Sequence, residues 1–177
     1  MSTGCVMKFS VRQITFTAVF TALNVLLSTF SVPTPFGGHF YLTDIAVCLA
    51  GITLNPVLAV VAGGGGAFLG DLFFYPAAML TTLITRSVQA FVISVFSNYI
   101  GKKKETLFSV IGCAIGVVIM VTGYTLGSAF IYSTPEYAVY KIPFQLLQAV
   151  VGVAVAIPVA YHLKIKKICN DYIRKDV

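Results

Sequence analysis

Charged residues are scarce in this sequence. Only 10% of its 177 residues are charged, while 58% are hydrophobic. A soluble domain of this length carries roughly a quarter of charged residues, so the composition excludes that class. The surplus apolar surface has to face lipid, and the sequence therefore predicts an integral membrane protein.

Signatures of enzymes and of metal sites are also missing. The sequence has no HExxH, GxSxG or Walker A motif, so we expect neither an enzyme nor an ATPase, and no cofactor or metal. No small-residue cleavage site follows the first apolar run, which favours a retained helix over a signal peptide. The cysteines lack metal-type spacing, and we interpret them as unpaired small hydrophobic residues. They are Cys5, Cys48, Cys113 and Cys169.

Six apolar segments punctuate the chain, and a membrane span needs about 20 such residues. Proline and glycine separate them, as in PTPFGG (33–38) and at Asn55-Pro56, where Asn suits a helix N-cap and Pro the first helical position. The expected spans are 14–32, 40–54, 57–74, 77–100, 106–132 and 143–163. The prediction is an all-α membrane protein, a bundle of six transmembrane helices in one domain, residues 1–177.

Basic residues set the expected orientation. Ten of the twelve lie at the two termini or between the fourth and fifth spans, which the positive-inside rule places in the cytoplasm. Both termini are therefore expected to be cytoplasmic. The net charge of +6 indicates topology and contact with membrane lipid, and no nucleic acid partner is expected.

Arg86 is the one strong charge expected deep inside a span. It lies ten residues after Pro76, about 15 Å along the helix. Such a group normally faces the protein interior and marks a functional path. Either it forms a structural ion pair with Asp71, or it contacts a polar ligand together with Gln89 at i+3, and both can hold.

The stretch AGGGGAFLGDLFFYP (62–76) combines four glycines with Asp71 and an aromatic group. A glycine face lets a neighbouring helix approach closely, or it leaves room for a ligand beside bare backbone.

Asp44, at the start of the second span, is interpreted as a helix N-cap. The segments on the outer side are aromatic, and they form either an interfacial belt or the roof of a pocket. Gln145 and Gln148 share one face of the sixth span, where amides join helices or bind a heterocycle.

Several blocks in a fixed order carry a family resemblance. They are FTAVFTALNVLLS with its Ala18-x-x-x-Ala22 motif, YLTDIAVCLAGITLNPVLAVVAGGGGAFLGDLFFYP, LITRSVQAF, GYTLGSAFIY and IPFQLLQAVVGVAVAIP. With six spans and both ends inside, the chain resembles the substrate-binding S components of energy-coupling factor (ECF) vitamin transporters. The blocks look most like the branch for pyridoxine and hydroxymethylpyrimidine.

The resemblance implies a multi-pass protein of a bacterial cell membrane and a division of labour between transporter subunits. An S component captures a vitamin from outside and docks on a T component with two ATPase subunits, then topples to carry its site inward. Docking would use Ala18 and Ala22. The substrate-binding residues expected on this basis are His39, Tyr41, Asp71, Tyr75, Arg86, Gln89, Tyr124, Lys141, Gln145 and Gln148.

The expected substrate is vitamin B6 or a related pyrimidine, with riboflavin, folate and cobalamin as alternatives. Two other classes compete with this interpretation. An autonomous carrier or channel would be expected to show internal repeats, and the sequence has no convincing one. An intramembrane enzyme would need acid, base or metal groups that the sequence does not supply.

Overall fold

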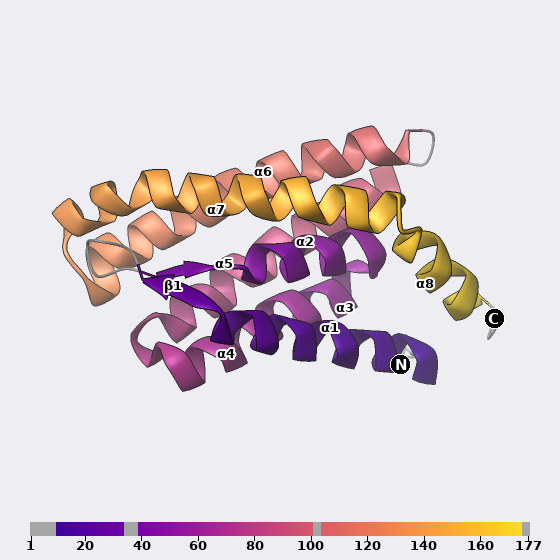
Figure 1. The fold of residues 1–177 in the computed structure, drawn as a ribbon, viewed down its shortest axis with the longest axis horizontal. Coiled ribbons are helices and arrows are strands. Elements are labelled where there is room, and N and C mark those ends of the chain that lie inside the picture. Colours follow the sequence, from indigo (N-terminus) through magenta and orange to yellow (C-terminus); the bar gives the residue numbers. More distant parts are fainter. Residues whose placement is uncertain (1–9, 34–38, 101–103, 175–177) are drawn as a thin grey trace, which may run out of the picture.

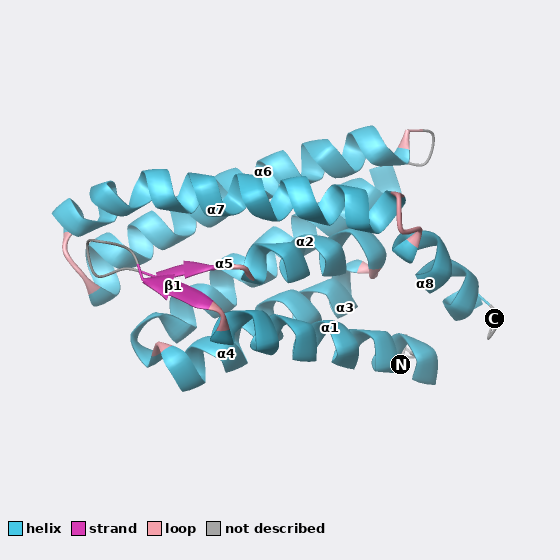
Figure 2. Ribbon diagram, viewed as in Figure 1, coloured by secondary structure: helices cyan, strands magenta, loops and turns pink. Residues whose placement is uncertain are grey.

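The structure is a computed structural model that describes residues 10–33, 39–100 and 104–174, and almost all of them are helical (Figures 1 and 2). The elements are α1 (Val11–Thr29), β1 (Ser31–Pro33), β2 (His39–Tyr41), α2 (Thr43–Thr53), α3 (Pro56–Val60), α4 (Gly66–Phe74), α5 (Met79–Val95), α6 (Glu105–Gly127), α7 (Pro135–Tyr161) and α8 (Ile165–Arg174). A π-helical turn, Val61–Gly65, joins α3 to α4. Similar turns, Phe96–Ile100 and Ser128–Tyr132, extend α5 and α6. A short 3₁₀ turn, Pro76–Ala78, precedes α5.

The all-α membrane bundle predicted from the sequence is confirmed. Five helical stretches of the described chain are long and apolar enough to cross a membrane. They are Val11–Thr29, Pro56–Phe74, Pro76–Ile100, Glu105–Ile131 and Pro135–Tyr161. The remaining predicted span corresponds to α2, an apolar helix of 11 residues that is buried along most of its length against α5 and α7.

Several helix boundaries differ from the predicted spans. The first helix ends at Thr29, not at Val32, because Ser31–Pro33 pairs antiparallel with His39–Tyr41. The last long helix begins at Pro135, eight residues before the predicted start at Pro143. The side chain of Thr134 caps this helix by accepting a hydrogen bond from the backbone N–H of Tyr137. The predicted spans do not include α8.

The start of α1, the start of α6 and the whole of α8 lie at one end of the bundle (Figure 1). The β1–β2 hairpin and the connection between α6 and α7 lie at the opposite end. This arrangement agrees with two termini on the same side of the membrane. Cys48, Cys113 and Cys169 are buried free thiols, and Cys5 lies outside the described residues.

The glycine run is a contact surface for α1. Asn24 of α1 is fully buried, and its amide donates to the backbone carbonyls of Ala62 and Gly63 at 3.2 and 3.1 Å. A Cβ atom on Gly66 would lie 2.8 Å from the Cβ atom of Asn24 and 3.1 Å from the carbonyl oxygen of Thr21. Close helix packing therefore explains the glycine at position 66.

Two neighbouring glycines give a matched test of this packing. A Cβ atom on Gly65 would meet nothing within 4 Å, in contrast to Gly66. Gly66→Ala is expected to lower the free energy of unfolding by about 1–3 kcal/mol, because it forces α1 away. Gly65→Ala should be neutral or stabilise by up to about 1 kcal/mol, since alanine favours helix. Thermal unfolding in detergent measures both, and equal shifts would contradict the packing argument.

Candidate functional site

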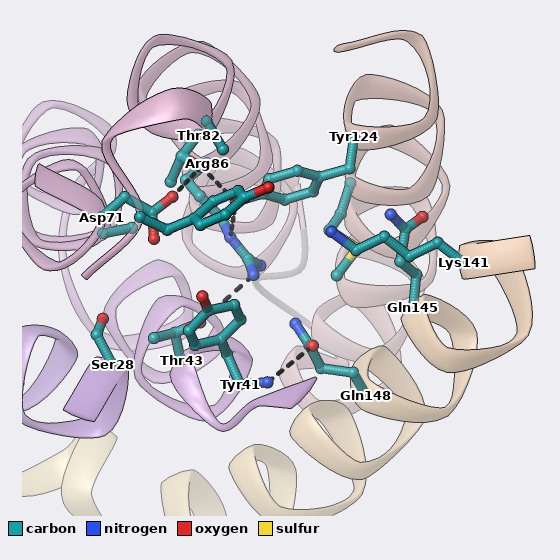
Figure 3. Close-up of a pocket in the computed structure, with 14 residues that line it drawn as sticks. Ser28, Tyr41, Thr43, Asp71, Thr82, Arg86, Tyr124, Lys141, Gln145 and Gln148 are labelled. Atoms are coloured by element: carbon teal, nitrogen blue, oxygen red, sulfur yellow. Dashed lines mark hydrogen bonds between the residues drawn. The ribbon is translucent and has the colours of Figure 1, made fainter. Parts of the chain in front are cut away.

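A narrow polar cavity lies inside the bundle (Figure 3), and Tyr41 of the hairpin strand β2 is part of its lining. It brings together eight of the ten residues predicted as a binding site. They are Tyr41, Asp71, Tyr75, Arg86, Tyr124, Lys141, Gln145 and Gln148. The cavity volume is about 40 Å³, which is room for roughly three water molecules. A larger guest would have to displace side chains.

The floor of the cavity is a buried ion pair between Arg86 and Asp44. Their side chains are only 2% and 1% exposed, and Nη1 of Arg86 forms a salt bridge with Oδ1 of Asp44. Nη2 of Arg86 donates to the other carboxylate oxygen, Oδ2, at 3.1 Å. Arg86 therefore pairs with Asp44, and the interpretation in which its ion-pair partner is Asp71 is wrong. The predicted capping role of Asp44 is wrong as well, because its carboxylate lies in the first turn of α2 and points to α5.

Neighbouring side chains complete the hydrogen bonding of this pair. Nη1 of Arg86 donates to Oε1 of Gln89 at 2.9 Å, and Nη2 donates to the hydroxyl of Thr43 at 3.4 Å. Gln148 donates its amide to Asp44. Gln89, one of the predicted substrate-binding residues, is fully buried and does not line the cavity. Its side chain instead holds the guanidinium of Arg86 in position.

A chain of hydrogen bonds leads from the ion pair to Asp71. Nε of Arg86 donates to the hydroxyl of Tyr124 at 3.3 Å, and the guanidinium lies 5.3 Å from the centre of that ring. The Tyr124 hydroxyl donates to Thr82 at 2.9 Å, and Thr82 donates to Asp71. Among the described residues, no cation lies within salt-bridge distance of Asp71.

The facing wall comes from α7, where Lys141, Gln145 and Gln148 point toward the cavity (Figure 3). No carboxylate of the described residues forms a salt bridge with Lys141. Gln145 is 4% exposed, and its amide nitrogen has no hydrogen-bond partner in the described part of the chain. The cavity therefore offers a carboxylate on one wall, and an ammonium and a free amide donor on the other.

Two tyrosines cover the cavity on the hairpin side. The backbone N–H of Tyr41 donates to Oε1 of Gln148 at 3.0 Å, which ties β2 to α7. Burial, with a smaller effect of Asp71, raises the pKa of the Tyr41 phenol well above its ordinary value, so it remains a neutral donor. Tyr75 follows α4 and is half-buried. His39 lies in β2, but its side chain is outside the described residues.

Other lining residues do not emerge from the sequence pattern. They include Ser28, Thr43, Thr82 and Met120. Thr82 precedes Arg86 by one helical turn, and that spacing is the one signal available for it. In the described residues, no group of three or more His, Cys, Asp or Glu side chains is placed to hold a metal ion.

The two alanines of the predicted docking motif lie on the outside of α1. Ala18 and Ala22 are exposed and line an apolar groove between α1 and the α3–α4 stretch. The groove also includes Ile14, Val25, Leu26, Val57, Val61 and Leu69. Asn24 and Ser28, by contrast, are buried on the inner side of the same helix.

Comparison with known proteins places these features in context. Residues 8–165 match the family model described as "ECF-type riboflavin transporter, S component". The chain is 28% identical, over 144 residues, to an uncharacterized protein in the gap 3' region of Pyrococcus woesei, covering 81% of this chain and 95% of that one. It shares its fold with the S component of a bacterial ECF transporter, with a TM-score of 0.70 and 18% identity. That match covers 86% of this chain and 95% of the other.

Proposed function

This chain belongs to the family of ECF-type riboflavin transporter S components, and we propose that its polar cavity is the site that captures the vitamin. Family membership makes it a multi-pass membrane protein and a substrate-binding part of a transporter, not itself an enzyme. The observation that carries the proposal is the buried amide of Gln145, which faces the cavity without a partner in the described chain. A buried donor of this kind is costly unless a ligand or water satisfies it.

Riboflavin is the first candidate substrate. The family description names it, and the tyrosines at positions 41, 75 and 124 suit the flat face of a heterocycle. The cavity of about 40 Å³ has to widen for such a ring. Tyr41, Tyr75 and Lys141 are half-buried, so their side chains have room to move aside.

A small zwitterionic heterocycle is the second candidate, and pyridoxine is the example. Asp71 and Lys141 line the same narrow cavity, from α4 and from α7. A pyridine nitrogen that binds a proton would pair with Asp71, and a phenolate oxygen would pair with Lys141. Riboflavin is neutral, so it has no charged groups that would pair with Asp71 and Lys141.

Titration of the detergent-purified protein with riboflavin and with pyridoxine tests the proposal. We expect a nanomolar dissociation constant for one of them, equivalent to about 12 kcal/mol. If the substrate is zwitterionic, Asp71→Asn and Lys141→Met should each weaken binding at least tenfold. If it is riboflavin, both should change the affinity only a few-fold.

Lys104→Met serves as the control for these titrations, because Lys104 is exposed, directly precedes α6 and does not line the cavity. It should leave the affinity unchanged. The proposal would be overturned if no vitamin in a wider panel binds. The panel consists of riboflavin, pyridoxine, hydroxymethylpyrimidine, folate and cobalamin.

Transport is proposed to need a T component and two ATPase subunits, as the family implies. The apolar groove around Ala18 and Ala22 supports docking of a helix there, since small residues allow close approach in membranes. Reconstituted alone in liposomes, the protein is expected to bind the vitamin without moving it. Unaided uptake would instead identify an autonomous carrier.

A further inference from the structure

A second polar cavity lies at the opposite end of the bundle, where α7 ends and α8 begins. Its volume is about 430 Å³, and its lining includes Glu105, Tyr161, Lys164, Lys166 and Lys167. Figure 1 shows α8 turned away from α7 at the end of the bundle where α1 begins. We propose that this cavity binds the phosphate headgroup of an anionic phospholipid from the cytoplasmic leaflet.

One wall of the cavity is fixed by a buried lysine. Lys166 is 5% exposed, and its ammonium group donates to the backbone carbonyl of Ser97 at 3.0 Å. It also forms a salt bridge of 3.3 Å with Glu105. The hydroxyl of Tyr161 donates to the backbone carbonyl of Glu105 at 3.1 Å. These contacts join α6, α7 and α8, and they compensate the negative charge of Glu105.

Two further lysines line the cavity, and few negative charges lie in the lining to balance their positive charges. Lys164 and Lys167 are exposed and form no salt bridge with a carboxylate of the described residues. Asp171 is the other acidic residue of the lining. With Glu105 paired to Lys166, two positive charges face one negative charge, so the cavity favours an anion.

The backbone at Lys164 supports a role for its side chain. Its φ angle is +56°, a left-handed conformation that usually carries glycine at the end of a helix. A lysine there is less favourable for the backbone than glycine. Strain at such a position is an indication of function when other observations agree.

The surroundings indicate a lipid as the source of the phosphate. Leu163 precedes Lys164 in the chain and Ile168 follows Lys167, and the two apolar side chains are 64% and 56% exposed. Exposed apolar side chains therefore border the lining lysines along the chain. The cavity lies where the span of α7 ends at Tyr161, which is the level expected for headgroups. The cytoplasmic leaflet carries the anionic lipids that attract such lysines. A soluble phosphate would not account for the apolar border.

Native mass spectrometry with added lipid tests the proposal. The purified protein is mixed with equal amounts of phosphatidylglycerol and phosphatidylcholine, and the lipid retained by each molecule is counted. The parent should retain phosphatidylglycerol preferentially. Lys164→Gln with Lys167→Gln should reduce that retention at least tenfold. Lys164→Gly with Lys167→Gln should do the same, and glycine suits the backbone there, so this variant separates loss of lipid from loss of fold.

The control is Lys104→Gln, which removes an exposed positive charge at the start of α6 that does not line the cavity. It should retain phosphatidylglycerol like the parent, and all variants should keep the parent's affinity for the vitamin. An equal loss in the control, or equal retention of both lipids, would overturn the proposal. Thermal stabilisation by inorganic phosphate equal to that by phosphatidylglycerol would also overturn it, in favour of a site for a free anion.

Discussion

Replacing Arg86 with alanine is expected to destabilise the protein strongly. The change leaves the carboxylate of Asp44, only 1% exposed, without its cation in the middle of the bundle. Loss of one partner of a buried ion pair commonly costs about 3–5 kcal/mol. Gln89 and Tyr124 would lose the donor that they accept from. A lower melting temperature and a lower yield of folded protein in detergent are the measurements to make.

A double variant separates the structural role of the pair from contact with the substrate. Asp44→Asn with Arg86→Gln replaces both charges with amides, and it should recover most of the lost stability. If the affinity for the vitamin recovers with the stability, Arg86 acts only through the fold. If the affinity stays at least tenfold weaker, the guanidinium contacts the substrate. An Arg86→Ala variant that melts like the parent would contradict the role of the ion pair.

Lys141→Ala is the matched control for the ion pair. Lys141 lines the same cavity and carries the same charge, but it is half-buried and has no salt bridge within the described chain. Its removal should cost far less stability than removal of Arg86. This difference in stability would show that the ion pair between Arg86 and Asp44 stabilises the protein, and that a positive charge in the cavity does not do so in general.

The membrane bundle could be predicted because long apolar runs with so few charges between them are stable only when lipid covers them. Much of the cavity lining could be predicted for a related reason. Polar side chains are rare inside spans, so Arg86, Gln145 and Gln148 stand out against the apolar background. Each of them lies in the cavity.

The partner of Arg86 could not be predicted, because it depends on packing between α2 and α5. From the sequence, only Asp71 is considered as a partner, and Asp44 is interpreted as a helix N-cap. Local rules favour a capping role for Asp44, since it precedes an apolar run. Burial of α2 between α5 and α7 overrides that rule and turns the carboxylate to Arg86. Asp71 is connected to Arg86 only through Thr82 and Tyr124.

The start of α7 shows the limit of proline as a boundary signal. Pro143 follows Lys141 and has the pattern of the first residue of a span, yet it lies inside the helix. Thr134-Pro135 carries the same signal with a better cap, and the helix begins there. α8 is missing from the predicted spans because it is only ten residues long and strongly polar on one side. Its apolar residues recur at helical spacing, and that spacing is the sequence signal for a short amphipathic helix.

Tryptophan at Ala22 is expected to abolish uptake by the complete transporter without harming capture of the vitamin. Ala22 and Ala18 lie one helical turn apart on the exposed side of α1, within the apolar groove. An indole at position 22 would fill this groove, and no change of its rotamer would leave space for a docking helix. If a helix of the T component docks there, the variant should fail to co-purify with the T component and the ATPases.

The geometry of α1 explains why capture should survive. Asn24 follows Ala22 by two residues, which is about 200° around the helix, and it faces the core. Ser28, the residue of α1 that lines the cavity, is buried on the same inner side. The affinity of the solitary Ala22→Trp protein should therefore stay within a few-fold of the parent.

Val19→Trp is the matched control for this docking face. Val19 is 57% exposed on the same helix, but it does not line the groove. The control adds the same indole to a surface that faces lipid, so uptake should persist. Normal uptake by the Ala22→Trp and Ala18→Trp transporters would place docking on another face. Equal failure of Val19→Trp would show that bulk anywhere on α1 blocks the cycle, and the groove would lose its special role.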